Sequence, residues 1–188
     1  MVKKVGIRML KKVLNGQGLY LSEDGFYSNG DWAIRDFLFK QRINKNVNLK
    51  IDRIVSKVID LLDVKELATI EPWILNKNIL QKEIREVYFY DNFKLFESIE
   101  YRVFYELDID KEINDRFLIN KIYYDFINQI LPLSKVVARV VKKTSYLVYD
   151  NKEDFYDQDY SLVFLWFPKY TTYNLKEILA VCMPALKK

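Results

Sequence analysis

The chain has 188 residues, of which 30 are basic and 26 are acidic, giving a formal net charge of +4. It contains no histidine, which excludes Ser-His-Asp and Cys-His catalysis, histidine-ligated zinc or haem, and histidine pH sensing. Its single cysteine, Cys182, excludes an internal disulfide and a multi-cysteine metal site.

The sequence has no apolar run that approaches the roughly 18 residues of a membrane-spanning helix. Charged residues also interrupt positions 1–18 too often for a signal peptide. We therefore expect a soluble, cytoplasmic protein with no membrane contact, and no motif predicts a cofactor.

The first predicted element is an amphipathic helix at residues 3–14, which Gly16 could end in a left-handed conformation. Four basic residues share its polar side at helical spacing: Lys4, Arg8, Lys11 and Lys12. Long basic side chains on one helix face can contact DNA phosphates, although such a face can also be merely solvated.

Two tight-turn dipeptides follow, Asp24-Gly25 and Asn29-Gly30. Glycine supplies the positive φ of a short hairpin turn, so this stretch is predicted to be an antiparallel meander. The three strands are predicted at residues 19–22, 26–28 and 31–37. The residues predicted to anchor them in the core are Trp32, Ile34 and Phe37. Residues 39–48 are predicted to be a loop.

A helical insertion is predicted at about residues 48–85. Apolar residues recur at helical spacing in residues 51–62, and Glu71-Pro72 resembles the start of a second helix, because proline suits the first helical position.

The remainder is predicted to be mainly strands, at residues 87–90, 93–97, 101–107, 116–119, 136–141, 145–149 and 160–167. A turn is expected at Asp91-Asn92 and an acidic loop at residues 150–159. Asn120 is predicted to cap a helix that ends before Pro132, and residues 174–188 are predicted to form a helical tail with Cys182 buried. The predicted fold is therefore α+β, a single domain over residues 1–188 in which helices pack on an antiparallel sheet.

Three acidic residues alternate at a predicted strand end: Glu106, Asp108 and Asp110. Alternation places carboxylates on one face, where they could share a magnesium ion as in a metal-dependent nuclease. The same pattern is also typical of a solvated strand end.

Three stretches carry a family resemblance: residues 28–34 (SNGDWAI), 119–127 (INKIYYDFI) and 160–168 (YSLVFLWFP). Together they resemble pieces of the DNA sliding clamp family of bacteria and their phages. The first stretch follows the first helix as a family turn does, the second is similar to the start of the family's second helix, and the third is similar to its closing strands. The resemblance covers about half of the chain and implies a clamp-like domain. A clamp chain repeats its domain two or three times, so the one copy here would need several subunits to form a ring.

The leading hypothesis is a non-enzymatic binding protein of phage type that acts in or against DNA replication. Its partners would be DNA, through the first helix, or a protein, including a further copy of itself. One alternative is the metal-dependent nuclease, and another is a protein-binding inhibitor of a host machine.

Overall fold

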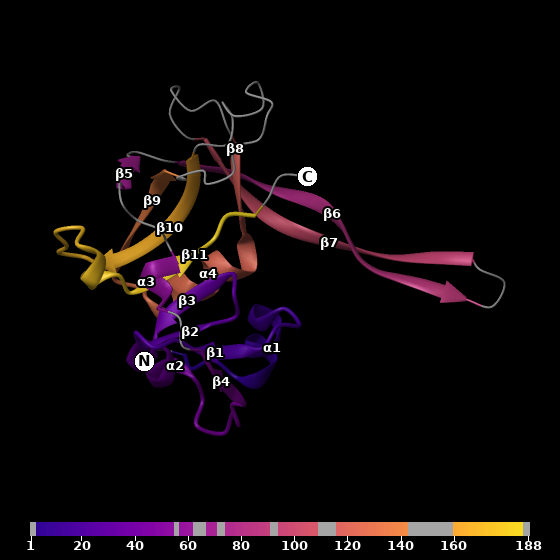
Figure 1. Ribbon diagram of the computed structural model, residues 1–188, viewed down its shortest axis with the longest axis horizontal. Helices are drawn as coiled ribbons and strands as arrows, with labels where there is room; N and C mark the ends of the chain where they lie inside the picture. The colour runs from indigo at the N-terminus through magenta and orange to yellow at the C-terminus, as the bar shows by residue number, and fades with distance from the viewer. Residues whose placement is uncertain are drawn as a thin grey trace.

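The described strands form an eight-stranded sheet and a three-stranded sheet (Figure 1). The computed structural model describes residues 3–54, 57–61, 67–70, 74–90, 94–108, 116–142 and 160–185. The larger sheet has the order β4-β1-β2-β3-β11-β10-β9-β5, and β4 and β1 are its parallel neighbours. The smaller sheet has the order β6-β7-β8. With its packed helices, the fold is α+β, which confirms the predicted class.

The strands of the larger sheet are β1 (Leu19–Leu21), β2 (Phe26–Ser28), β3 (Trp32–Arg35), β4 (Ile51–Arg53), β5 (Leu67–Ile70), β9 (Ser134–Lys142), β10 (Tyr160–Pro168) and β11 (Ala180–Cys182). Those of the smaller sheet are β6 (Ile74–Tyr90), β7 (Lys94–Asp108) and β8 (Arg116–Asn120). The helices are α1 (Ile7–Leu14), α2 (Asp36–Arg42), α3 (Val58–Leu61), α4 (Lys121–Ile130) and the 3-10 helix η2 (Leu175–Glu177).

The predicted meander is present as β1, β2 and β3, because its turns are built from local side-chain contacts. Ser22 Oγ accepts a hydrogen bond from the backbone N–H of Phe26 at 2.9 Å. Asn29 Oδ1 accepts from the backbone N–H groups of Asp31 and Trp32. Gly30 has φ of 100°, the positive value that the turn requires.

Strand β11 joins the meander to the C-terminal hairpin. It lies between β3 and β10, with Val181 opposite Ala33 on one side and Leu165 on the other. Successive residues of a strand alternate between the two faces of a sheet, and both faces are buried here. Trp32, Ile34, Phe164 and Trp166 belong to one core cluster, whereas residues 33, 163, 165 and 181 belong to the other.

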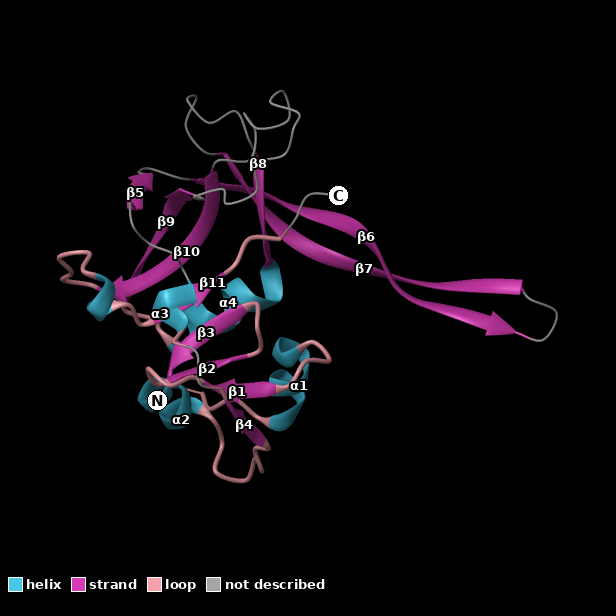
Figure 2. Ribbon diagram, viewed as in Figure 1, coloured by secondary structure: helices cyan, strands magenta, loops and turns pink. Residues whose placement is uncertain are grey.

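Helices α1, α2 and α4 cover the first face, and Figure 2 shows α4 beside β3 and β11. Asn120 caps α4 as predicted, because its Oδ1 accepts from the backbone N–H of Ile122 at 3.0 Å. Short helix α3 and the segment around η2 cover the second face through Val58, Leu175 and Ile178.

Among the described residues, no helix is long and apolar enough to cross a membrane.

The third strand is shorter than predicted. It ends at Arg35, and Asp36 and Phe37 begin α2, which extends to Arg42 through the residues predicted as a loop. Asp36 accepts a hydrogen bond from the N–H of Phe37, and a carboxylate favours the positive end of a helix. Phe37 is consequently 54% exposed and does not anchor the core, whereas Trp32 and Ile34 are buried as predicted.

The predicted helical insertion at residues 48–85 is wrong for its described part. Residues 51–53 form β4, because they pair with β1 in parallel and the backbone N–H of Ile54 donates to the Leu21 carbonyl oxygen. Helix α3 has only four residues and starts where Asp24 accepts hydrogen bonds from Val58 N and Ile59 N. Residues 74–85 belong to the long strand β6.

The predicted helical tail at 174–188 is also wrong for its described part. It consists of η2 and then β11, because residues 180–182 pair with β3 on one side and with β10 on the other, which requires an extended backbone. Several predicted features lie outside the described residues: the start at Glu71-Pro72, the turn at Asp91-Asn92, the strand at 145–149, the acidic loop at 150–159 and residues 186–188.

Candidate nucleic-acid interface

Helix α1 is fixed to the meander at its C-terminal end. Trp32 Nε1 donates to the carbonyl oxygen of Val13 at 2.8 Å, and the side-chain amide of Asn29 donates to the same oxygen at 3.1 Å. Asn29 Nδ2 also lies 3.3 Å from the Leu14 carbonyl oxygen. These contacts satisfy carbonyls that a helix end leaves without intrahelical partners, so the orientation of α1 on the sheet is defined.

Leu10 and Val13 are the buried residues of α1, and the opposite side of the helix faces solvent. Arg8, Lys11 and Lys12 are exposed on that side, and no acidic residue lies in the first turn. These three residues are called the basic face of α1 here. None of them forms an ion pair with any residue that the structure describes.

Lys4 does not share this face, which corrects the prediction. The helix starts only at Ile7, because Gly6 has an extended backbone and Val5 pairs with Ile43. Val5 N donates to the Arg42 carbonyl oxygen at 2.7 Å, which ties the segment of Lys4 to the end of α2. Lys4 is exposed there.

Positive charge is concentrated in this part of the chain. Residues 3–54 contain eleven basic and five acidic residues, an excess larger than that of the whole chain. Because the Val5–Arg42 contact joins the start of α1 to the end of α2, Lys4 and Arg42 extend the positive region beyond the basic face of α1.

Two apolar side chains flank the basic face of α1. Ile7 is 48% exposed and Met9 is 38% exposed. Their exposure adds a non-polar component to this surface.

Comparison with protein-family models, with curated proteins and with solved structures finds no significant match. The resemblance to sliding clamps therefore remains an expectation from the sequence.

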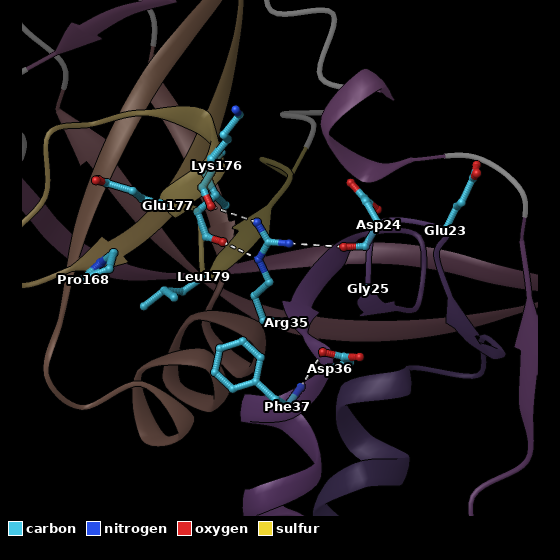
Figure 3. A pocket seen from close by; sticks show the side chains of 11 residues that line it. Glu23, Asp24, Gly25, Arg35, Asp36, Phe37, Pro168, Lys176, Glu177 and Leu179 are labelled. Carbon is cyan, nitrogen blue, oxygen red and sulfur yellow. Dashed lines mark hydrogen bonds between the residues drawn. The ribbon is translucent and has the colours of Figure 1, made fainter.

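The described surface also contains a pocket beside β3, shown in Figure 3. Arg35 lies at its centre and donates from Nε to the Ile178 carbonyl oxygen, from Nη1 to that of Asp24 and from Nη2 to that of Lys176. The guanidinium carbon also lies 4.1 Å from the centre of the Phe26 ring. Burial lowers the pKa of Arg35, although Asp24 and Asp36 act in the opposite direction.

Two of the carboxylates around the pocket, those of Asp24 and Glu177, accept several hydrogen bonds from the protein itself. Asp24 accepts hydrogen bonds from Ser22 and from the first turn of α3. Burial alone would raise the pKa of Asp24, but these hydrogen bonds hold it below the ordinary value. Glu177 accepts from Thr171 and Thr172. The pocket is lined by the turn between β1 and β2, by the junction of β3 with α2 and by the segment around η2, and the charged groups named above bond mainly to the protein itself.

The acidic residues proposed for metal binding are only partly placed. Glu106 and Asp108 lie on one face of β7, with Glu106 opposite Lys77 and Leu118, and Asp108 opposite Ile74 and Arg116. Asp110 lies outside the described residues. Among those that are described, no three His, Cys, Asp or Glu residues are grouped so that they could hold a metal ion.

Cys182 is fully buried on β11, as predicted. Burial raises the pKa of its thiol, and the charge of Asp31 acts in the same direction, so the reactive thiolate is disfavoured.

The sequence predicts only a turn at Asn29, although its side chain also holds the end of α1 and so supports the site. The sequence prediction also gives no role to Arg139, which lies away from the site on β9. Arg139 is 6% exposed, donates to the Tyr173 carbonyl oxygen and lies against the Phe167 ring. A charged residue within the run VVARVVK was the available signal for a buried arginine.

Proposed function

We propose that this protein is a non-enzymatic factor that binds nucleic acid through the phosphate backbone, with the basic face of α1 as its contact surface. The observation that carries the proposal is the exposure of Arg8, Lys11 and Lys12 on one side of a helix whose other side and C-terminal end are fixed to the sheet. A fixed helix presents three cations in a defined spacing, and their ordering costs little on binding.

The contact would be electrostatic. Lysine and arginine on a helix surface can reach phosphate oxygens without reading base edges, so they provide affinity without sequence preference. Lys4 and Arg42 would add charge around the contact at the joined ends of α1 and α2. The sequence resemblance to sliding clamps is the ground for placing this activity in DNA replication, in the cytoplasm of a bacterial or phage-infected cell.

A fluorescence-anisotropy titration with duplex DNA at several salt concentrations tests the proposal. Three phosphate contacts predict a slope of roughly −3 in a plot of log K against log salt. The triple variant R8Q/K11Q/K12Q should flatten that slope, and adding Lys4→Gln should reduce low-salt affinity further.

A matched control removes the same number of charges elsewhere. Lys57, Lys169 and Lys176 are exposed and lie outside residues 3–54. Changing these three to glutamine should leave most of the salt dependence in place. Equal slopes for the two triple variants, or no binding of the wild type at low salt, would refute DNA contact by α1.

The free energy of unfolding of the R8Q/K11Q/K12Q variant must be measured together with its DNA affinity. Lys11 and Lys12 lie in the last turn of α1, where a cation stabilises a helix by about 0.3–1 kcal/mol each. A loss of that size leaves the protein folded, so lost binding in the α1 variant would report on the contact itself.

A further inference from the structure

The outer part of the β6–β7 hairpin extends away from the rest of the molecule as a two-stranded ribbon (Figure 1). Strand β8 pairs with β7 only from Phe104 to Asp108, so residues 94–103 of β7 have β6 as their paired neighbour. Residues 80–90 and 94–103 are called the arm here. A two-stranded hairpin is marginally stable in water on its own, so an arm of this length is expected to gain stability from a covering surface.

The arm has one apolar face. Directly opposed residues share a face, and we call each opposed pair a row. From the tip inward, the rows of this face pair Phe89 with Leu95, Val87 with Glu97, Ile84 with Ile99, Lys82 with Tyr101, and Leu80 with Val103. Eight of these ten residues are apolar or aromatic. The opposite face of the arm is mostly polar: its three inner rows pair Glu86 with Ser98, Glu83 with Glu100, and Gln81 with Arg102, and its two rows near the tip pair Tyr88 with Phe96 and Tyr90 with Lys94.

Strand β6 has two irregularities, and the second lies within the arm. The register shifts between Leu75 and Lys77 and between Ile84 and Glu86, which leaves Asn76 and Arg85 as extra residues. Each extra residue reverses the alternation of β6, whereas β7 alternates without interruption. Without the second shift, Glu86 and Tyr88 would take the places of Val87 and Phe89 on this face. Register is strongly specified where one face of a strand is buried, so the observed register fits a face that packs against another surface.

The apolar face is continuous with the core at its inner end. Tyr105 of β7 lies on the same face and is paired with Ile119 of β8, which is fully buried in the first core cluster. The core-facing side of the small sheet thus continues along the arm.

The five rows are symmetric about the central Ile84–Ile99 row. The two outermost rows are wholly apolar, and each row next to the centre carries one charge, Lys82 on the inner side and Glu97 on the outer side. Two copies of this face can pack against each other about a two-fold axis that runs along the central row, so that the strands of the two copies are antiparallel. In this arrangement, the outermost apolar rows of one copy lie against the outermost apolar rows of the other. The row that contains Lys82 lies against the row that contains Glu97 of the second copy. The pattern is self-complementary in both apolar character and charge.

We propose that the arm is a homodimerisation element, and that its apolar face packs against the same face of a second copy of this chain. In that dimer β6 lies over β6 and β7 over β7, so Ile84 lies across the interface from Ile84 of the second copy. DNA does not suit this face, because only one of its ten residues is basic. The proposal is independent of DNA contact by α1.

Sedimentation equilibrium of the full chain, with charge-swap variants, tests the dimer. The wild type should show twice the monomer mass. Lys82→Glu and Glu97→Lys should each weaken dimerisation about tenfold or more, because each sets like charges in opposed rows. The double variant K82E/E97K restores opposite charges and should recover wild-type affinity, an outcome that damage to the fold would not give.

The matched control is Glu100→Lys, which makes the same charge change on the same strand but on the other face. It should leave the dimer intact. A wild type that is monomeric at every concentration, a double variant that does not recover, or equal weakening by Glu100→Lys would each overturn the proposal.

Cross-linking gives a second, geometric readout. Packed sheets lie about 10 Å apart, so Ile84→Cys should be joined efficiently to its counterpart by a short bismaleimide. Glu83→Cys lies on the other face and should not be joined. The native Cys182 is fully buried and should not compete for the reagent. Equal cross-linking of the two variants would contradict dimerisation through the apolar face.

Discussion

The indole nitrogen of Trp32 lies 2.8 Å from the carbonyl oxygen of Val13, and this hydrogen bond joins the central meander to the end of α1. Trp32 is 1% exposed and also packs against Phe39 of α2 and Phe126 of α4, with ring centres 6.0 and 5.7 Å away. One side chain therefore contacts three helices that cover the same face of the sheet. Stability and the orientation of the proposed interface depend on the same residue.

Trp32→Ala should lower the free energy of unfolding by about 3–5 kcal/mol, because it leaves a large cavity among those rings. Trp32→Phe keeps much of the volume but removes the donor to Val13, and should cost at least the roughly 1 kcal/mol of one hydrogen bond. Chemical denaturation measures both. The control is Tyr170→Ala at an 89% exposed position, which should change little. An unchanged melting temperature for Trp32→Ala would contradict this account.

Arg35→Lys should destabilise the protein by about 2–3 kcal/mol, since one ammonium group cannot donate to three carbonyl oxygens in the geometry of a guanidinium fork. Denaturant titration gives the value. Arg53→Lys serves as the control, because Arg53 is exposed on β4. Similar losses at the two positions would mean that the hydrogen bonds of Arg35 contribute nothing specific.

Stability should fall in acid because of Asp24. The pKa of Asp24 is lower in the folded state than its ordinary value of 3.8. The resulting stabilisation is fully present above that ordinary value and is lost as the pH falls through the lower folded pKa. Denaturation midpoints between about pH 6 and pH 2 should drop less steeply in Asp24→Asn than in the wild type. Parallel pH profiles would exclude Asp24 as a contributor.

Glu106→Ala and Asp108→Ala should each change the free energy of unfolding by no more than about 0.5 kcal/mol, the usual range for surface substitutions. Neither should remove an activity. A magnesium-dependent cleavage assay on the wild type and both variants checks this expectation. Cleavage by the wild type that either variant loses would replace the binding proposal with the nuclease alternative.

The sequence predicts best those elements whose cause is local. Asn29-Gly30 places its own turn, and Asn120 caps α4 through a backbone N–H two residues away. No distant residue has to be known for either contact. The meander and α4 are accordingly found where the sequence places them.

The first part of β6, residues 74–85, is predicted as a helix for a physical reason, whereas residues 87–90 are predicted as a strand. Leu75, Ile79, Leu80 and Ile84 recur at helical spacing. In the strand, the extra residue Asn76 places Leu75 on the same face as Leu80 and Ile84, and Ile79 lies on the other face. A strand pattern in which apolar residues alternate with a period of two, once interrupted by an extra residue, can resemble the period of 3.6 of a helix. Only the pairing partner, β7, distinguishes the two.

The candidate site was predicted in part. Helical periodicity correctly groups Arg8, Lys11 and Lys12, because they lie within one continuous helix. Lys4 was grouped with them wrongly, since the pairing of Val5 with Ile43 depends on a contact across 38 positions of sequence. The apolar face of the arm is not predicted from the sequence, because it depends on the pairing register of β6 with β7.

The place of β11 between β3 and β10 has a consequence for how this chain reaches its fold. During synthesis, β3 emerges well over a hundred residues before β11, which pairs with the edge of β3 opposite to β2. Until then, the edge of β3 that pairs with β11 presents unpaired backbone groups, a condition that favours aggregation. Pairing across such a separation also slows folding, because loop closure must precede the contacts that reward it. Ribosome-bound chains that stop before Ala180 should therefore depend on chaperones, and protection of the β3 backbone against hydrogen exchange should appear only once Cys182 has left the exit tunnel.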